Sequence, residues 1–233
     1  MPNILALDTS TAACSAALWC DGGIAAKRYE IMARGHAEHL MPMVDEVMAQ
    51  TTVTAANLDL IAVTTGPGAF TGLRLGLAAA RGLALALDIP CLGVMTTETL
   101  AAALPEGEEE EVVLAALDSK RNDLYVQAFG AGRNPLGPPQ AVAPEQVPSV
   151  MPDGCVGINR CAIVGDAQAA CVSILADAGW LARETDVTMP DAATLAGLAA
   201  ARWRSGMTIP APTPLYLRPP DAVIPKDGGR IRR

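Results

Sequence analysis

The stretch Leu5-Ala6-Leu7-Asp8-Thr9-Ser10 carries a pattern that returns 110 residues later as Ala115-Ala116-Leu117-Asp118-Ser119-Lys120. At both places an apolar run of the kind that forms a buried strand ends in an aspartate and a polar turn. A second apolar run follows each turn, at residues 14–19 and 124–129. We interpret this pattern as a weak internal repeat. It predicts an α/β fold of two related lobes, each a mixed sheet with helices, with a cleft between them.

Hydrophobic periodicity places further elements around these two stretches. Predicted strands cover residues 4–7, 14–19, 24–29, 60–63, 91–94, 112–117, 124–129 and 161–164, and predicted helices cover residues 36–49, 70–87, 97–104, 167–178 and 191–204. Asp21-Gly22-Gly23 is a hairpin signal, so we expect the chain to open with an antiparallel meander. Pro42 is expected to bend or delay the helix at residues 36–49.

A run of charge predicts where the two lobes meet along the chain. Pro105-Glu106-Gly107 is followed by four consecutive glutamates, a pattern typical of a solvated surface connection. Residues 1–104 are therefore assigned to an N-terminal lobe and residues 105–206 to a C-terminal lobe. Residues 207–233 contain six prolines and five basic against two acidic residues, so we predict an extended or partly disordered tail with a local charge of +3.

Composition excludes several classes of protein. The chain has 233 residues, 51% of them hydrophobic and only 3% aromatic, and its 43 alanines predict a closely packed core of small side chains. A net charge of −8 disfavours nucleic-acid binding by the chain alone. The six cysteines form no C-x-x-C pair and are interpreted as small hydrophobes. The N-terminus lacks the basic region of a signal peptide, and the apolar stretch 73–87 is too short to span a bilayer, which predicts a cytoplasmic protein without a membrane partner.

Two strand ends are candidates for a phosphate or nucleotide cleft. Asp8, Thr9 and Ser10 could hold Mg²⁺ between a carboxylate and a phosphate, and Asp118 repeats this arrangement. An aspartate that caps its own turn is an equally good interpretation from the pattern alone. Gly66 and Gly68 precede a predicted helix, whose free N–H groups could receive an anion. The block lacks the GK[ST] ending of a Walker loop, however, and a tight turn is the favoured interpretation.

The helices at 36–49 and 70–87 could form an association surface. Gly72, Gly76, Ala79 and Ala80 lie near one face of the second helix, where small residues allow another helix to approach closely. The first helix carries Met41, Met43 and Met48, whose flexible side chains suit adaptable contacts. From the pattern alone, a simple core role for both faces is an equal alternative.

The two histidines give no clear metal or hydrolase signal. His36 and His39 are three residues apart, without the glutamate of an H-E-x-x-H motif or an evident third ligand. A surface or capping role is favoured, and no metal site is predicted.

Several blocks resemble the TsaB (YeaZ) family. They are Leu5 to Ser10, His36-Ala37-Glu38-His39-Leu40-Met41-Pro42, Gly66-Pro67-Gly68-Ala69-Phe70-Thr71-Gly72-Leu73-Arg74 with Gly76, Leu117-Asp118-Ser119-Lys120-Arg121 leading to Tyr125, and Pro214-Leu215-Tyr216-Leu217-Arg218. The resemblance spans essentially the whole chain. It implies an ASKHA fold, the fold of actin, Hsp70 and sugar kinases, in two lobes.

The resemblance also implies a function. TsaB-like proteins are dimerisation subunits of the bacterial complex that places a threonylcarbamoyl group on the adenosine next to the tRNA anticodon. Catalysis belongs to the paralogue TsaD, with the ATPase TsaE as third partner, and tRNA would be met only through the complex. Thr96 and Leu100 stand where the paralogue has its metal-binding histidine pair. Neither side chain can replace an imidazole ligand, so no catalytic residue and no transferase site are expected here.

The same resemblance assigns a partner surface for TsaD or for a second copy of the chain. Its residues are Leu40, Met41, Met43, Val44, Val47, Gly72, Leu73, Gly76, Ala79 and Ala80. Gly165 stands where ASKHA nucleotide binders often place a glycine against the adenosine, and Ala167 adds a methyl group there. We therefore expect no intrinsic cofactor and at most weak or partner-dependent binding of Mg-ATP or ADP.

Two alternatives come from other functional classes. An ATP-dependent small-molecule kinase would use the same cleft, with Asp8 or Asp118 holding Mg²⁺. A metallopeptidase would need a metal site for which the chain lacks the histidine pair.

Overall fold

The computed structural model describes residues 1–105, 112–152 and 159–218, which form two five-stranded sheets. The first sheet has the order β3-β2-β1-β4-β5 and the second the order β10-β9-β6-β7-β8. The strands are β1 (Ile4–Asp8), β2 (Ala13–Cys20), β3 (Gly23–Ile31), β4 (Leu60–Thr64), β5 (Cys91–Val94), β6 (Val112–Asp118), β7 (Leu124–Phe129), β8 (Gln140–Val142), β9 (Arg160–Val164) and β10 (Leu181–Arg183). The helices are α1 (His36–Ala49), α2 (Phe70–Leu87), α3 (Thr96–Ala103), α4 (Gln168–Asp177) and α5 (Ala192–Arg202), with 3₁₀ turns η1 (Ala55–Asn57), η2 (Ala131–Arg133) and η3 (Pro144–Val150).

The two sheets have the same topology, which confirms the predicted pair of related lobes. In the first sheet β1 pairs antiparallel with β2, β2 antiparallel with β3, and β1 and β5 flank β4 in parallel. In the second sheet β6 to β10 take the places of β1 to β5 with the same directions. Asp8 and Asp118 therefore end equivalent central strands, as the repeated pattern predicts.

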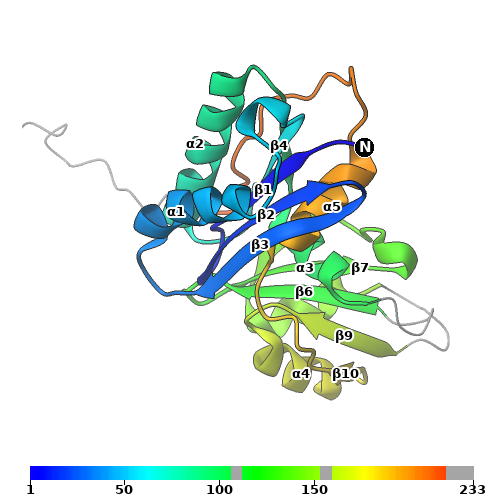
Figure 1. Cartoon of the computed structure of the whole chain (residues 1–233). Helices are drawn as coiled ribbons and strands as arrows, with labels where there is room; N and C mark the ends of the chain where they lie inside the picture. The colour runs from blue at the N-terminus through cyan, green and yellow to red at the C-terminus, as the bar shows by residue number, and fades with distance from the viewer. Residues whose placement is uncertain (106–111, 153–158, 219–233) are drawn as a thin grey trace, which may run out of the picture.

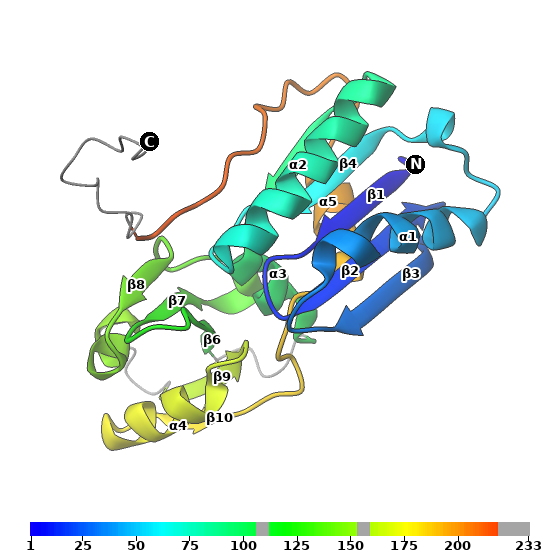
Figure 2. The ribbon, with the colours of Figure 1, turned by 90° about the vertical axis from the view of Figure 1, so that its left-hand side faces the viewer.

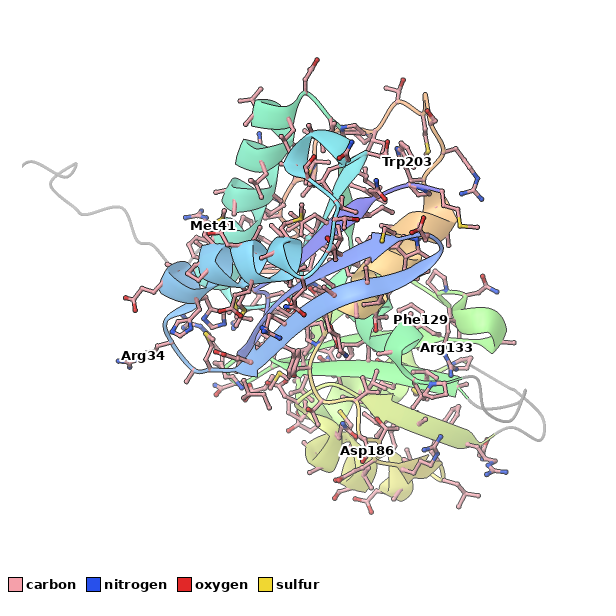
Figure 3. The ribbon with its side chains drawn as sticks, in the orientation of Figure 1. Arg34, Met41, Phe129, Arg133, Asp186 and Trp203 are labelled. Atoms are coloured by element: carbon pink, nitrogen blue, oxygen red, sulfur yellow. The ribbon has the colours of Figure 1, made fainter. Side chains whose placement is uncertain are left out.

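Each sheet is covered on both faces, because successive side chains of a strand point to opposite sides. In the first lobe Leu5 and Leu7 pack with α1 and α2, whereas Ile4 and Ala6 pack with α5. In the second lobe one face packs with α4 and η3, and the other packs with α3. Phe129 is fully buried on the α3 side of its sheet (Figure 3). Figure 1 shows α1 and α2 on one side of the first sheet, with α5 behind it and α4 at the far side of the second sheet.

The two lobes exchange one helix each, which corrects the predicted lobe boundaries. Helix α3 lies within residues 1–104, yet Leu100 and Ala101 pack on the second sheet with Val113 and Ala115. Helix α5 lies within residues 105–206, yet Leu195 packs on the first sheet. Both helices have an apolar side that could pack on either sheet. The residue pattern therefore could not assign them, and assigning each helix to the strands nearer to it along the chain led to the wrong sheet. The predicted boundary at the run of glutamates lies outside the described residues.

The C-terminal segment 207–218 has no helix or strand and runs along the first lobe to the second. The amide of Leu215 donates to the carbonyl of Thr65 at 2.7 Å, and Arg218 bonds Asp123 before β7 at 2.9 Å. Figure 2 shows this segment passing beside α2 before it meets the second lobe. The extended form predicted for the tail is confirmed here, and residues 219–233 lie outside the described part of the chain.

Other differences from the predicted elements are small. Pro42 lies inside α1 without delaying its start at His36. Strands β8 and β10 have three residues each, too few to give a periodic signal. By length and composition α2 could cross a membrane, but in this fold Leu73, Leu77 and Ala80 of that helix are buried inside the protein.

Candidate functional site

The first strand end holds a carboxylate that is closed off from solvent. Asp8 is fully buried, and its Oδ1 accepts hydrogen bonds from Thr64 Oγ1 at 2.5 Å, from Ser10 Oγ at 2.7 Å and from the amide of Ser10 at 3.3 Å. Asp8 Oδ2 is buried and has no hydrogen-bond partner among the residues that the structure describes. Burial raises the pKa of Asp8 to about 6, although the hydrogen bonds from Thr64 and Ser10 and the nearby His36 act in the opposite direction.

The glycines that open α2 allow this turn to lie directly on the helix. Thr9 Oγ1 donates to the carbonyl of Gly72 at 2.7 Å, and the amide of Ala69 donates to the carbonyl of Ser10 at 2.7 Å. A Cβ atom on Gly72 would collide with the Thr9 carbonyl oxygen. The same holds for Gly68 against Ser10, and a Cβ on Gly76 would lie 2.6 Å from Thr9 Oγ1. Close packing against the Thr9–Ser10 turn, through backbone oxygens at Gly68 and Gly72 and through the Thr9 hydroxyl at Gly76, therefore explains these glycines.

The prediction of an open phosphate site at this turn is contradicted by burial. Asp8, Thr9 and Ser10 are at most 1% exposed, and Gly66 is buried against the carbonyl of Leu215. The start of α2, which could have received an anion, is instead in contact with the Asp8–Ser10 turn. Asp8 consequently presents no solvent-accessible oxygen to a metal ion or a phosphate.

At the second strand end Asp118 bonds the residue next to Gly165, and two groups that the sequence did not single out, Lys120 and Asp166, lie beside it. Lys120 Nζ lies 3.1 Å from Asp118 Oδ2 and 3.0 Å from Asp166 Oδ2. Asp118 Oδ1 accepts the amide of Lys120, and Asp166 Oδ1 accepts the amide of Asp118. Partial burial acts to lower the pKa of Lys120, but its hydrogen bonds to Asp166 and Asp118 outweigh this effect and raise the pKa.

In this arrangement the two carboxylates that could hold Mg²⁺ are paired with Lys120. Mg²⁺ needs carboxylate oxygens with free lone pairs and open space for its waters. All four carboxylate oxygens of Asp118 and Asp166 already accept a hydrogen bond from the chain, and Lys120 supplies the positive charge that a metal ion would bring. Gly165 leaves no room for a side chain, since a Cβ atom there would collide with the carbonyl of Ala116.

The positions compared with a metal-binding histidine pair are part of the core. Thr96 and Leu100 are both fully buried at the start of α3 and on the face that it turns to the second sheet. Within the described ranges, no group of three or more His, Cys, Asp or Glu side chains is placed to hold a metal ion. His36 Nε2 lies 3.0 Å from the carbonyl of Thr11, and His39 pairs with Glu30 at 3.5 Å.

The predicted partner surface is wrong for most of its residues. Eight of its ten residues are buried inside the first lobe: Leu40, Met43, Val44, Val47, Gly72, Leu73, Gly76 and Ala80. Of the remaining two, Ala79 is half-buried and Met41, labelled in Figure 3, is 40% exposed. The small and apolar stripes face the protein's own sheet, which is the core alternative that the pattern left open.

The exposed faces of the same two helices carry different residues. On α2 the exposed stripe is Phe70, Arg74, Ala78, Arg81 and Leu85, with side chains three or four residues apart along one side. On α1 the exposed residues include Glu38, Met41 and Asp45. Phe70 is 48% exposed and Leu85 is 85% exposed, an unusual exposure for large apolar side chains. We call these residues of α1 and α2 the helix-pair face.

A family model described as TsaD, tRNA N6-adenosine threonylcarbamoyltransferase, matches residues 22–179. The chain is 29% identical to the tRNA threonylcarbamoyladenosine biosynthesis protein TsaB of Escherichia coli (strain K12), over 93% of this chain and 94% of that protein. It is 38% identical to the protein of the same name from Haemophilus influenzae (strain ATCC 51907 / DSM 11121 / KW20 / Rd), over about half of each chain (53% and 52%). It is also 32% identical to an uncharacterized protein of Mycobacterium bovis, over 94% and 93% of the two chains.

The solved structures give the same result. YeaZ from Pseudomonas aeruginosa superposes with a TM-score of 0.80 and 31% sequence identity, covering 93% of this chain and 100% of that chain. A second Pseudomonas aeruginosa structure, described as similar to peptidase YEAZ, has a TM-score of 0.78 and 32% identity. These likenesses confirm the predicted ASKHA fold class.

Proposed function

The chain belongs to the TsaB (YeaZ) family, and from this premise we propose that it acts in the cytoplasm as a non-catalytic subunit in the biosynthesis of tRNA threonylcarbamoyladenosine. In this proposal it binds a TsaD-type catalytic paralogue, holds it in its active state, and meets tRNA and a TsaE-type ATPase only within the complex. A second copy of the chain could occupy the same surface when the paralogue is absent.

One observation carries the non-catalytic role: the aspartates that end the two equivalent central strands, Asp8 and Asp118, are both occupied by the chain's own groups. Asp8 is buried beneath α2, and Lys120 bridges Asp118 and Asp166. Transfer chemistry on a phosphate or carbamoyl group would need a free carboxylate, metal or base at such a place. The buried Thr96 and Leu100 agree with this reading.

The helix-pair face supports the partner role. It combines exposed apolar side chains with the basic Arg74 and Arg81 on α2 and the acidic Glu38 and Asp45 on α1. Exposed apolar residues bordered by charges are typical of protein–protein interfaces. The side of α1 and α2 that docks is accordingly the outer one.

Replacing Ala78 by arginine is expected to weaken the complex with a TsaD-type paralogue by at least about tenfold, because a long charged side chain would stand in the middle of the exposed stripe. Ala176→Arg is the matched control, since Ala176 is an exposed alanine of α4 in the other lobe. Analytical size exclusion and titration calorimetry measure both complexes. Equal affinities for the two variants would remove the helix-pair face from the proposal.

Nucleotide binding by the isolated chain is expected to be weak or absent and to depend on the partner. Titration calorimetry of the chain alone with Mg-ATP is expected to give no more heat than dilution. Saturable binding accompanied by ATP hydrolysis would instead favour the ATP-dependent small-molecule kinase.

A further inference from the structure

The N-terminal part of α2 carries an arginine that is stacked on one aromatic ring and hydrogen-bonded to the hydroxyl of a second. The guanidinium of Arg74 lies 3.7 Å from the centre of the Phe70 ring and 5.7 Å from that of Tyr216. The two rings lie 5.2 Å apart, and Arg74 Nε donates to the hydroxyl of Tyr216 at 2.9 Å. An arginine that is stacked on a ring and hydrogen-bonded through Nε has lost much of its rotational freedom.

The second ring of this stack comes from the C-terminal segment, which is itself fixed at several points. Next to Tyr216, the amide of Leu215 bonds Thr65 at the end of β4. Earlier in the segment Pro212 is buried against Gly93, where a Cβ atom would come within 2.9 Å of the proline Cβ. Arg218 bonds Asp123 of the second lobe. The segment therefore holds Tyr216 in place and, through its hydroxyl, orients Arg74.

The outward side of this guanidinium is left open. The structure gives Arg74 a single hydrogen bond, from Nε, and among the described residues the two terminal nitrogens Nη1 and Nη2 have no partner. Arg28, Arg202 and Arg218, by contrast, each pair with a carboxylate of the chain, from Glu46, Glu98 and Asp123. A fork of two free N–H pairs in a fixed orientation matches the two oxygens of a carboxylate.

We propose that Arg74 is the docking point for a carboxylate on the TsaD-type paralogue, and that residues 212–218 belong to the docking surface because they orient it. The group that binds is thus the carboxylate of an aspartate or glutamate side chain of that partner. The Arg74 guanidinium is already held in one orientation before binding, so binding costs little side-chain entropy. This inference rests on the proposed function and adds a residue, a binding chemistry and a second chain segment to it.

The test measures affinity for the paralogue at low and at high salt with full-length variants. Arg74→Gln is expected to weaken the complex about tenfold or more and to reduce the dependence of affinity on salt, because the charged pair is gone. Tyr216→Phe keeps the ring and removes the hydroxyl, so a smaller loss with the salt dependence preserved is expected. Arg74→Lys keeps the charge without the fork and is expected to stay weaker than the wild-type chain.

Arg204→Gln is the matched control, because Arg204 is an exposed arginine just after α5, the helix on the opposite face of the first sheet from α1 and α2. Its affinity is expected to remain within about twofold of the wild type. Undiminished binding by Arg74→Gln, or an equal loss in Arg204→Gln, would overturn the inference and leave the proposed function standing. A wild-type chain that forms no complex with the paralogue would overturn both. Thermal unfolding of each variant shows whether it is folded.

Discussion

Replacing Gly72 by alanine is expected to lower the free energy of unfolding by roughly 4 kcal/mol, a large part of the stability of an ordinary domain. The added methyl group would collide with the carbonyl oxygen of Thr9, which is a backbone atom of a fully buried turn. Either the turn or α2 has to move. Any such movement also strains the buried hydrogen bond from Thr9 Oγ1 to the carbonyl of Gly72 and the backbone hydrogen bond from Ala69 to Ser10.

Gly82→Ala is the control for this experiment, since it makes the same change ten residues further along the same helix. A Cβ on Gly82 has nothing within 4 Å, so the better helix propensity of alanine should raise stability by about 1 kcal/mol. Urea unfolding followed by circular dichroism measures both variants. Two variants of equal stability would contradict the view that the glycines of this block serve the contact between the turn and the helix.

Between pH 4 and pH 8, the stability of Asp8→Asn relative to the wild type is expected to change by about 2.5 kcal/mol. The pKa of Asp8 is raised by burial from an ordinary value of 3.8 to about 6 in the folded chain. Between these values the folded state keeps a proton that the unfolded chain has released. The contribution of the protonated Asp8 is therefore fully present below pH 3.8 and is lost as the pH rises through 6.

Asparagine has no carboxyl proton to lose. The free energy of unfolding of Asp8→Asn should therefore increase relative to that of the wild type as the pH rises, and this difference should shrink towards pH 4. Urea unfolding at a series of pH values gives the difference directly. Asp45→Asn, which changes an exposed aspartate of α1, is expected to follow the wild-type curve. A difference between Asp8→Asn and the wild type that stays constant with pH would mean that Asp8 titrates normally in the folded protein.

Local sequence pattern predicts most of this fold because both lobes are built from short buried strands and from helices with a clear apolar side. The repeat around Asp8 and Asp118 predicts the duplicated sheets, and the observed helices begin and end within about two residues of those expected. The pattern could not assign α3 and α5 to a sheet, because Leu100 and Leu195 are suitable for the core of either lobe.

The candidate site was harder to predict for a physical reason. Small and apolar residues at helical spacing mark a face that packs closely, and they do not say whether the neighbour is the same chain or another one. Gly76 faces Thr9 of its own lobe, whereas the outer face of α2 is marked by Arg74, whose surroundings depend on a tyrosine 142 residues further along the chain. No window of local sequence contains that pair.

The reciprocal placement of α3 and α5 makes the two halves of the chain mutually dependent. In a fragment that ended before β6, α3 would have no second sheet to pack on. The face of the first sheet that carries Ile4 and Ala6 would be exposed to solvent, because α5 would be missing. Neither half is self-sufficient, so denaturation should proceed as one cooperative transition, and co-expressed halves should recover the native state only by associating with each other.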